Sequence, residues 1–156
     1  MMEDETHMKL ELSISCDNLP NMDTISLTDS ACVVFLWQNE SWIRVGQTET
    51  ITDNLNPKFV KTILVDYFFE QKQKIMIKVY DVDDFDPKVD VAQNEIGLVE
   101  FYLHEILKGK NQTIVLPIKK GSAYYIETLD ILEICKLWQK KKKEEAKTHI
   151  RCNMQL

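Results

Sequence analysis

Hydrophobic and polar residues alternate strictly from Lys9 to Ile14, so that every second side chain is apolar. A period of two is typical of a β-strand with one buried face. Similar runs recur along the chain, with proline, asparagine and glycine between them. We therefore expect eight strands, at residues 9–14, 32–37, 42–50, 62–68, 74–80, 96–103, 112–118 and 126–134.

Eight short strands with few helical periods predict an all-β fold, an eight-stranded antiparallel β-sandwich of the Greek-key type. Two short helical patterns interrupt the strands. One covers residues 103–107 and connects two strands, and the second begins near Cys135. Neither pattern changes the predicted class.

The composition is that of a soluble globular domain, with 44% hydrophobic and 28% charged residues in a chain of 156. No apolar run approaches the twenty or so residues that a spanning helix needs, and the acidic first residues lack the features of a signal peptide. These observations predict a cytoplasmic protein. The formal net charge of −6 argues against constitutive binding to nucleic acid or to an anionic membrane.

The four cysteines, at positions 16, 32, 135 and 152, form no CxxC pair, and we expect reduced thiols rather than disulfides or zinc ligands. The three histidines, at positions 7, 104 and 149, are isolated from one another in the sequence. The sequence contains no GxSxG motif and no phosphate-binding glycine loop. Since no nucleophile has a recognisable base, the sequence does not predict an enzyme, although clustered aspartates leave a carboxylate-metal hydrolase formally open.

The organisation along the chain predicts one main domain and additional segments. Residues 1–7 form an amino-terminal tail, residues 8–138 the domain, and residues 139–148 a charged linker that contains four consecutive lysines. A lysine run of this kind is usually solvated, with a phosphoinositide-binding or nuclear-import element as the alternative. Residues 149–156 are strand-like again, and we interpret them as the start of a second domain.

Two pairs of aspartates carry the most informative chemistry. Asp23 and Asp29 bracket a short polar loop, and Asp81 and Asp83 follow a strand about fifty residues later. Positions 81 and 83 differ by two, so both side chains leave the same face of an extended segment. Carboxylate oxygens are the ligands that Ca²⁺ prefers. If the two loops meet, these four residues predict a calcium site.

Apolar residues in the same two loops suggest a membrane contact, because turns are ordinarily polar. They are Ile25 and Leu27 in the first loop and Phe85, Val89 and Val91 in the second. Calcium would turn a negative loop end into a positive one that accepts lipid phosphate or carboxylate oxygens. The alternative is that these side chains pack back onto the sandwich.

A second candidate surface consists of lysines in the middle of the chain: Lys58, Lys61, Lys72, Lys74 and Lys78. Lys74 and Lys78 share one face of their strand. Such a face would bind a lipid headgroup or a partner protein. The alternative is an ordinary solvent-exposed face of an amphipathic sheet.

Several segments resemble the first C2 domain of the copine family. The most specific is DYFFEQKQ at residues 66–73, which runs into VYDVD at residues 79–83; DTISLTD at 23–29, VGQTE at 45–49 and NLNPKF at 54–59 also contribute. The resemblance covers roughly residues 8–134. It implies a C2 β-sandwich, followed in the natural protein by a second C2 domain and a von Willebrand A-like domain.

The resemblance also implies that the four aspartates are calcium ligands and that a fifth aspartate should stand where this chain has Asn94. Asn94 offers a neutral oxygen instead, and Ser30 replaces a proline that often follows the aspartate at position 29. Both departures weaken the calcium assignment. The nearby residues that could compensate are Asp84, Asp86, Asp90 and Glu95.

The function predicted on this basis is calcium-dependent binding to anionic phospholipids, phosphatidylserine or phosphoinositide, with a cytoplasmic protein moving to the plasma membrane or another membrane when calcium rises. Nuclear entry remains open because of the lysine run. The competing hypothesis is a calcium-independent domain with a degenerate metal site, which binds target proteins through the lysine face or a sheet edge.

Overall fold

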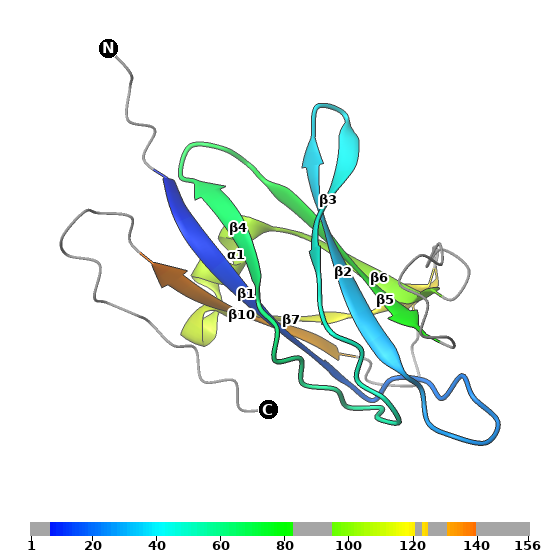
Figure 1. Cartoon of the computed structure of the whole chain (residues 1–156). Helices are drawn as coiled ribbons and strands as arrows, with labels where there is room; N and C mark the ends of the chain where they lie inside the picture. Colours follow the sequence, from blue (N-terminus) through cyan, green and yellow to red (C-terminus); the bar gives the residue numbers. More distant parts are fainter. Residues whose placement is uncertain (1–6, 83–94, 121–122, 125–130, 140–156) are drawn as a thin grey trace, which may run out of the picture.

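The computed structural model describes residues 7–82 and 95–119 in full, and the backbone of residues 120, 123–124 and 131–139. Its strands form two antiparallel sheets that pack face to face (Figure 1). The predicted all-β sandwich is therefore confirmed. Among the described residues, no helix is both long and apolar enough to cross a membrane.

The smaller sheet has four strands in the order β4-β1-β10-β7. Its strands are β1 (His7–Asp17), β4 (Ile63–Phe68), β7 (Thr113–Pro117) and β10 (Ile131–Gln139). β1 is central and pairs with both β4 and β10, so that Leu10 lies between Val65 and Trp138 in the register. The two ends of the domain are thus joined in one sheet.

The larger sheet has six strands in the order β3-β2-β5-β6-β8-β9. They are β2 (Ser30–Gln38), β3 (Ser41–Gln47), β5 (Lys74–Asp81), β6 (Glu95–Tyr102) and the two-residue strands β8 (Lys119–Lys120) and β9 (Ala123–Tyr124). Asn39 and Glu40 both have positive φ, which fits the tight hairpin between β2 and β3. β8 and β9 are too short to be recognised from periodicity.

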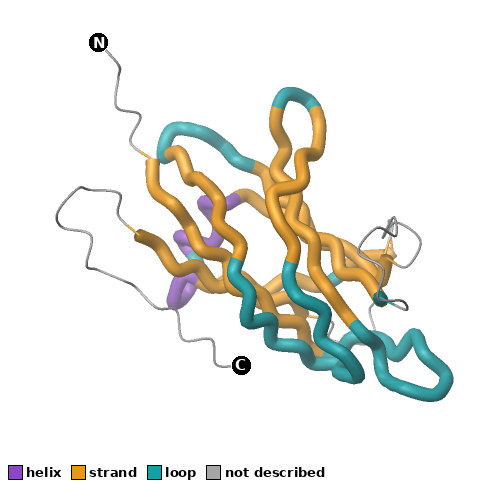
Figure 2. The backbone as a smooth tube through the Cα atoms, viewed as in Figure 1, coloured by secondary structure: helices purple, strands orange, loops and turns teal. Residues whose placement is uncertain are grey.

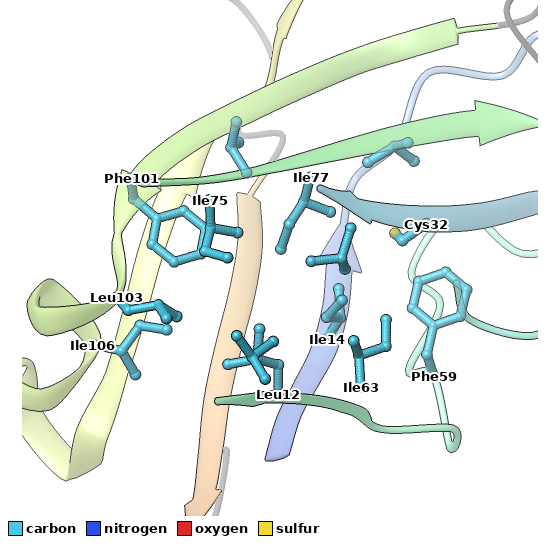
Figure 3. Packing of buried hydrophobic residues seen from close by; sticks show 14 of the residues in the cluster. Leu12, Ile14, Cys32, Phe59, Ile63, Ile75, Ile77, Phe101, Leu103 and Ile106 are labelled. Carbon is cyan, nitrogen blue, oxygen red and sulfur yellow. The ribbon is translucent and has the colours of Figure 1, made fainter. Parts of the chain in front are cut away.

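The core lies between the sheets and follows the alternation seen in the sequence (Figure 3). Leu12 and Ile14 of β1 are completely buried, as are Ile75 and Ile77 of β5 on the opposite sheet. Cys16 and Cys32 are buried free thiols, and burial, followed by a hydrogen bond with Cys16, raises the pKa of Cys32. Burial of these apolar faces is the main favourable contribution to folding.

The segment after β6 forms the short helix α1 (Leu103–Lys108) and the single turn η2 (Lys110–Gln112). Leu103 and Ile106 face the core, and the amide of Tyr102 donates to Glu105 Oε2 at 2.6 Å at the helix start. The predicted helix at 103–107 is confirmed. The helix predicted near Cys135 is wrong, because Cys135 lies inside β10, where it pairs with Ser13 of β1.

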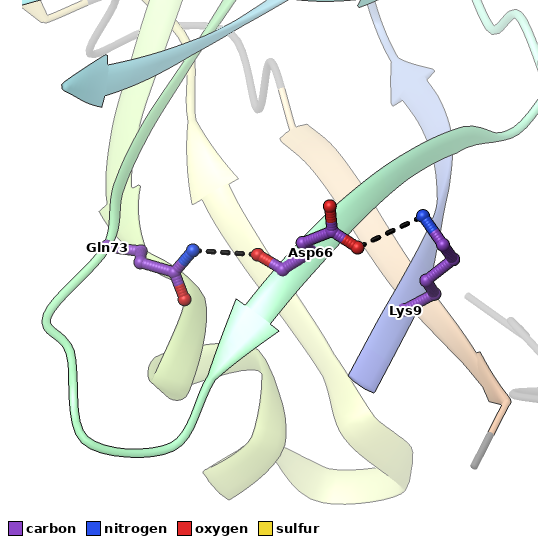
Figure 4. Close-up of polar contacts among 3 residues, drawn as sticks. All are labelled: Lys9, Asp66 and Gln73. Carbon is purple, nitrogen blue, oxygen red and sulfur yellow. Dashed lines mark hydrogen bonds and ion pairs between the residues drawn. The ribbon is translucent and has the colours of Figure 1, made fainter. Parts of the chain in front are cut away.

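The specific segment at residues 66–73 forms the end of β4 and the turn into β5 (Figure 4). Gln73 is buried; its Oε1 accepts the Phe68 amide at 2.9 Å, and its Nε2 donates to the Asp66 carbonyl at 2.7 Å. The Asp66 carboxylate forms an exposed ion pair with Lys9 at 3.1 Å. The final glutamine of this segment therefore closes the turn that begins β5.

Candidate functional site

Two loops lie together at one end of the sandwich (Figure 2). Loop 1, residues 18–29, connects β1 to β2, and loop 2, residues 48–62, connects β3 to β4. The Leu19 amide donates to the Leu55 carbonyl at 2.8 Å, and the Asn54 amide donates to the Thr28 carbonyl at 3.2 Å. Backbone hydrogen bonds thus hold the two loops against each other.

Asp29 and Asp81, which are far apart in the sequence, meet at this end. The Asp29 amide donates to Asp81 Oδ1 at 3.3 Å, and the Val82 amide donates to the Asp29 carbonyl at 2.7 Å. Asp81 is 4% exposed, whereas Asp29 is half-buried. The start of β2 and the end of β5 therefore bring Asp29 and Asp81 next to each other.

Asp53 of loop 2 completes this network, although the sequence did not single it out. Its carboxylate accepts the Leu27 amide at 2.6 Å, and its own amide donates to Asp29 Oδ1 at 2.7 Å. Its φ of 57° lies in the left-handed region, which aspartate tolerates better than most residues. Asp53 therefore ties Leu27 and Asp29 of loop 1 to loop 2. We call this pair of hydrogen bonds the Asp53 clamp.

Asp23 lies on the outer part of loop 1. Its Oδ2 accepts the Ser26 hydroxyl at 3.2 Å, whereas the carboxylate of Asp29 accepts the Asp53 amide. Within loop 1, the Thr28 hydroxyl accepts the Met22 amide and donates to the Pro20 carbonyl. These bonds hold the two ends of loop 1 together, between Pro20 and Thr28.

The other predicted ligands, Asp83 and Asn94, and the apolar residues Phe85, Val89 and Val91 lie outside the described residues. Over residues 7–82 and 95–119, no three His, Cys, Asp or Glu side chains converge closely enough to hold one metal ion.

The chemistry of the donors present nevertheless fits calcium. Asp29 and Asp81 supply oxygen, and Ser30, cross-strand neighbour of Asp81, is completely buried with a hydroxyl that has no partner among the described atoms. The Ser30 amide donates to the Ile51 carbonyl at 2.9 Å, a bond that the proline expected here would remove.

The apolar residues of loop 1 are exposed. Ile25 is 99% exposed and Leu27 is 41% exposed. Met22 in the same loop is 44% exposed, and the sequence pattern had not indicated it. These side chains therefore do not pack back onto the sandwich, which was the alternative for Ile25 and Leu27.

The five predicted lysines do not form one cluster. Lys58 and Lys61 are exposed in loop 2, whereas Lys72, Lys74 and Lys78 lie near or on β5. Lys74 pairs with Glu100 at 2.9 Å and Lys78 with Glu95 at 3.4 Å. The hydrogen bond with Glu100 raises the pKa of Lys74 above its ordinary value. The two β5 lysines are therefore largely neutralised by β6.

Comparison with protein families gives a match to the C2 domain over residues 9–118. Copine-B of Dictyostelium discoideum is 36% identical over 115 residues, which cover 71% of this chain and 22% of that protein. Nicotinic receptor-associated protein 1 of Caenorhabditis elegans is 30% identical over 116 residues, 63% of this chain and 18% of that protein. The chain spans about a fifth of the length of the curated relatives it matches.

Solved structures show the same architecture at low identity. A single C2 domain of a plant extended synaptotagmin 1 superposes with a TM-score of 0.62 and 16% identity, covering 91% of this chain and all of that domain. Human GIVD cytosolic phospholipase A2 superposes with a TM-score of 0.58 and 18% identity, covering 86% of this chain and 17% of that enzyme. At this identity, the similarity establishes the fold alone.

Proposed function

The chain belongs to the C2 domain family, and from that premise we propose that it binds anionic phospholipid membranes in a calcium-dependent manner. The similarity to Copine-B confirms the resemblance to copines noted in the sequence. The observation that carries the proposal is the meeting of Asp29 and Asp81 beneath an exposed apolar loop tip.

The residues proposed to hold calcium are Asp23, Asp29 and Asp81, with Asp83 and Asn94 from the segment outside the described residues. Without a cation, carboxylates that share a binding site repel one another and repel an anionic membrane. A bound calcium ion would supply the positive charge that cancels this repulsion and the coordination positions that lipid oxygens could fill.

Ile25, Leu27 and Met22 are proposed to provide the apolar part of the attachment. Each is exposed on loop 1 and could enter the headgroup region without unfolding of the sandwich. Burying an aliphatic side chain contributes about 1.5–3 kcal/mol, so a few such residues give reversible attachment. We further propose a cytoplasmic pool that moves to membranes when calcium rises.

Cosedimentation with phosphatidylserine vesicles tests the proposal, in excess calcium and again in chelator at physiological ionic strength. Asp29→Asn and Asp81→Asn keep an oxygen acceptor for the loop hydrogen bonds but remove the charge. Glu70→Gln is the matched control, because Glu70 is an exposed acid in the turn between β4 and β5, at the other end of the sheet. Only the two loop variants should lose calcium-dependent binding.

Equal sedimentation with calcium and with chelator would refute the calcium dependence. No sedimentation in either condition would refute membrane binding by this chain. Ile25→Ala tests the tip separately: it should weaken vesicle binding several-fold without lowering stability, whereas Leu64→Ala should leave vesicle binding unchanged. Leu64 is 55% exposed on β4 and pairs with Glu11 in the middle of β1, away from loop 1.

A further inference from the structure

An aromatic hollow lies on the outer face of the larger sheet, at the end with the β2–β3 hairpin. Its volume is about 550 Å³, and it is lined by Trp37, Trp42, Lys72, Lys74, Glu100 and Tyr102. It is a depression open to solvent rather than an enclosed cavity, and its size is within the range of ligand-binding clefts. We call these six residues the hairpin hollow.

Its aromatic rings are exposed but held in place. Trp37 is 45% exposed and Tyr102 38% exposed. The rings of Trp37 and Trp42 contact each other edge to face, with 5.1 Å between centroids, and the Lys74 ammonium lies 5.9 Å from the Trp42 centroid. Exposed aromatic rings that are already ordered lose little conformational entropy when a partner covers them, and such residues are enriched in binding interfaces.

The charges around the hollow favour an acidic occupant. Glu100 is already paired with Lys74. Lys72 and Arg44 are exposed, and neither forms an ion pair in the described part of the chain. Arg44 lies on the same face of β3 as Trp42, two residues further along the strand. Two uncompensated cations thus flank the rings on a chain whose formal net charge is −6.

The position of the hollow argues for a protein occupant rather than a lipid headgroup. Lys74 begins β5 at the hollow, and Asp81 ends the same strand at the loops. Seven residue steps at about 3.3 Å each separate the two sites by roughly 23 Å. When the loop end faces a membrane, the hairpin hollow therefore faces away from the lipid. This step rests on the membrane attachment proposed above.

We propose that the hairpin hollow binds an extended acidic segment of a partner protein. An aromatic side chain of that segment occupies the space between Trp37, Trp42 and Tyr102, and flanking carboxylates pair with Lys72 and Arg44. The adjacent strand β3 is the edge of the sheet, so a partner segment can lie along it. The whole domain then links a protein at one end to a membrane at the other.

Fluorescence anisotropy with labelled peptides tests this proposal on the whole chain in chelator. The probes are a peptide of alternating glutamate and phenylalanine, one of alternating lysine and phenylalanine, and one of alternating glutamate and alanine. The first should bind at least about tenfold more tightly than the other two. Lys72→Glu should weaken its binding about tenfold, whereas Lys58→Glu, which makes the same charge change in loop 2, should leave it unchanged.

Equal binding of the three peptides, no binding, or equal losses in the Lys72→Glu and Lys58→Glu variants would overturn the proposal. Phosphoinositide vesicles that bind in chelator and are released by Lys72→Glu would overturn it in favour of a headgroup site. The Asp81→Asn variant separates this proposal from the preceding one: it should lose calcium-dependent sedimentation and still bind the acidic peptide.

Discussion

Replacing Asp53 tests whether the Asp53 clamp prepares loop 1 for an ion. Two features distinguish the informative variants: the carboxylate that accepts the Leu27 amide at 2.6 Å and the backbone φ of 57°. Asp53→Asn keeps an acceptor and tolerates this φ, Asp53→Gly keeps only the φ, and Asp53→Ala keeps neither. The calcium affinity of the three variants should therefore decrease in that order.

The expected loss of calcium affinity follows from the contacts that each variant loses. A hydrogen bond to a charged acceptor contributes about 1.5–3 kcal/mol, and the exposure of Asp53 favours the lower value. In Asp53→Ala, the left-handed backbone conformation costs about 1 kcal/mol more than in Asp53→Gly. Because about 1.4 kcal/mol is tenfold in an equilibrium constant, calcium affinity should fall roughly tenfold in Asp53→Gly, further in Asp53→Ala, and little in Asp53→Asn.

Titration calorimetry with calcium measures the affinities, and hydrogen exchange of the Leu27 amide in chelator measures the clamp without calcium. Exchange at Leu27 should accelerate about tenfold in Asp53→Gly, and the free energy of unfolding in chelator should fall by no more than about 1.5 kcal/mol. Unchanged exchange and affinity in Asp53→Gly would refute the reasoning. Asp53→Asn binding calcium as weakly as Asp53→Gly would show that the charge matters and the hydrogen bond does not.

Three further predictions concern stability. The Glu49 carboxylate accepts hydrogen bonds from the amides of Val60 and Lys61. Burial raises the pKa of Glu49, but these hydrogen bonds outweigh burial and lower the pKa below its ordinary value. The ionised carboxylate therefore contributes to stability above the ordinary glutamate pKa, and this contribution is lost as pH falls through the lowered pKa. Glu49→Gln should therefore reduce stability at pH 7, with the difference shrinking in acid, in denaturant titrations at several pH values; a loss that is independent of pH would contradict this. Gln73→Ala should cost about 2 kcal/mol in urea unfolding because two backbone groups lose their partner, and a neutral result would show that water replaces it. Leu12→Ala should cost about 2–5 kcal/mol by the same measurement, because the side chain is completely buried, and a loss below about 1 kcal/mol would contradict its place in the core.

The sequence predicted the elements whose pattern is local. Strand β5 was expected at 74–80 and spans Lys74–Asp81, and the helix expected at 103–107 spans Leu103–Lys108. The last strand was expected at 126–134, whereas β10 is Ile131–Gln139. Its register depends on pairing with β1 and β7, so local periodicity could not position it.

The candidate site was predictable only in part. Asp29 and Asp81 could be recognised as candidate ligands, because each stands at a strand end beside a polar loop and calcium prefers carboxylate oxygens. Asp53 was missed because its function depends on a hydrogen bond to Leu27, a contact between two loops that no sequence spacing encodes. The available signal was the Asp53-Asn54 pair, since both residue types tolerate positive φ.

The pairing of β1 with β10 has a consequence for folding during synthesis. Lys9, near the start of the chain, has Gln139 as its partner, and β10 lies between β1 and β7. Of the described strands, β10 is synthesised last, so until then one edge of β1 and one edge of β7 have no strand beside them. Such non-local pairing slows folding, and open strand edges promote association between chains. The growing polypeptide is therefore most vulnerable to aggregation just before residues 131–139 emerge.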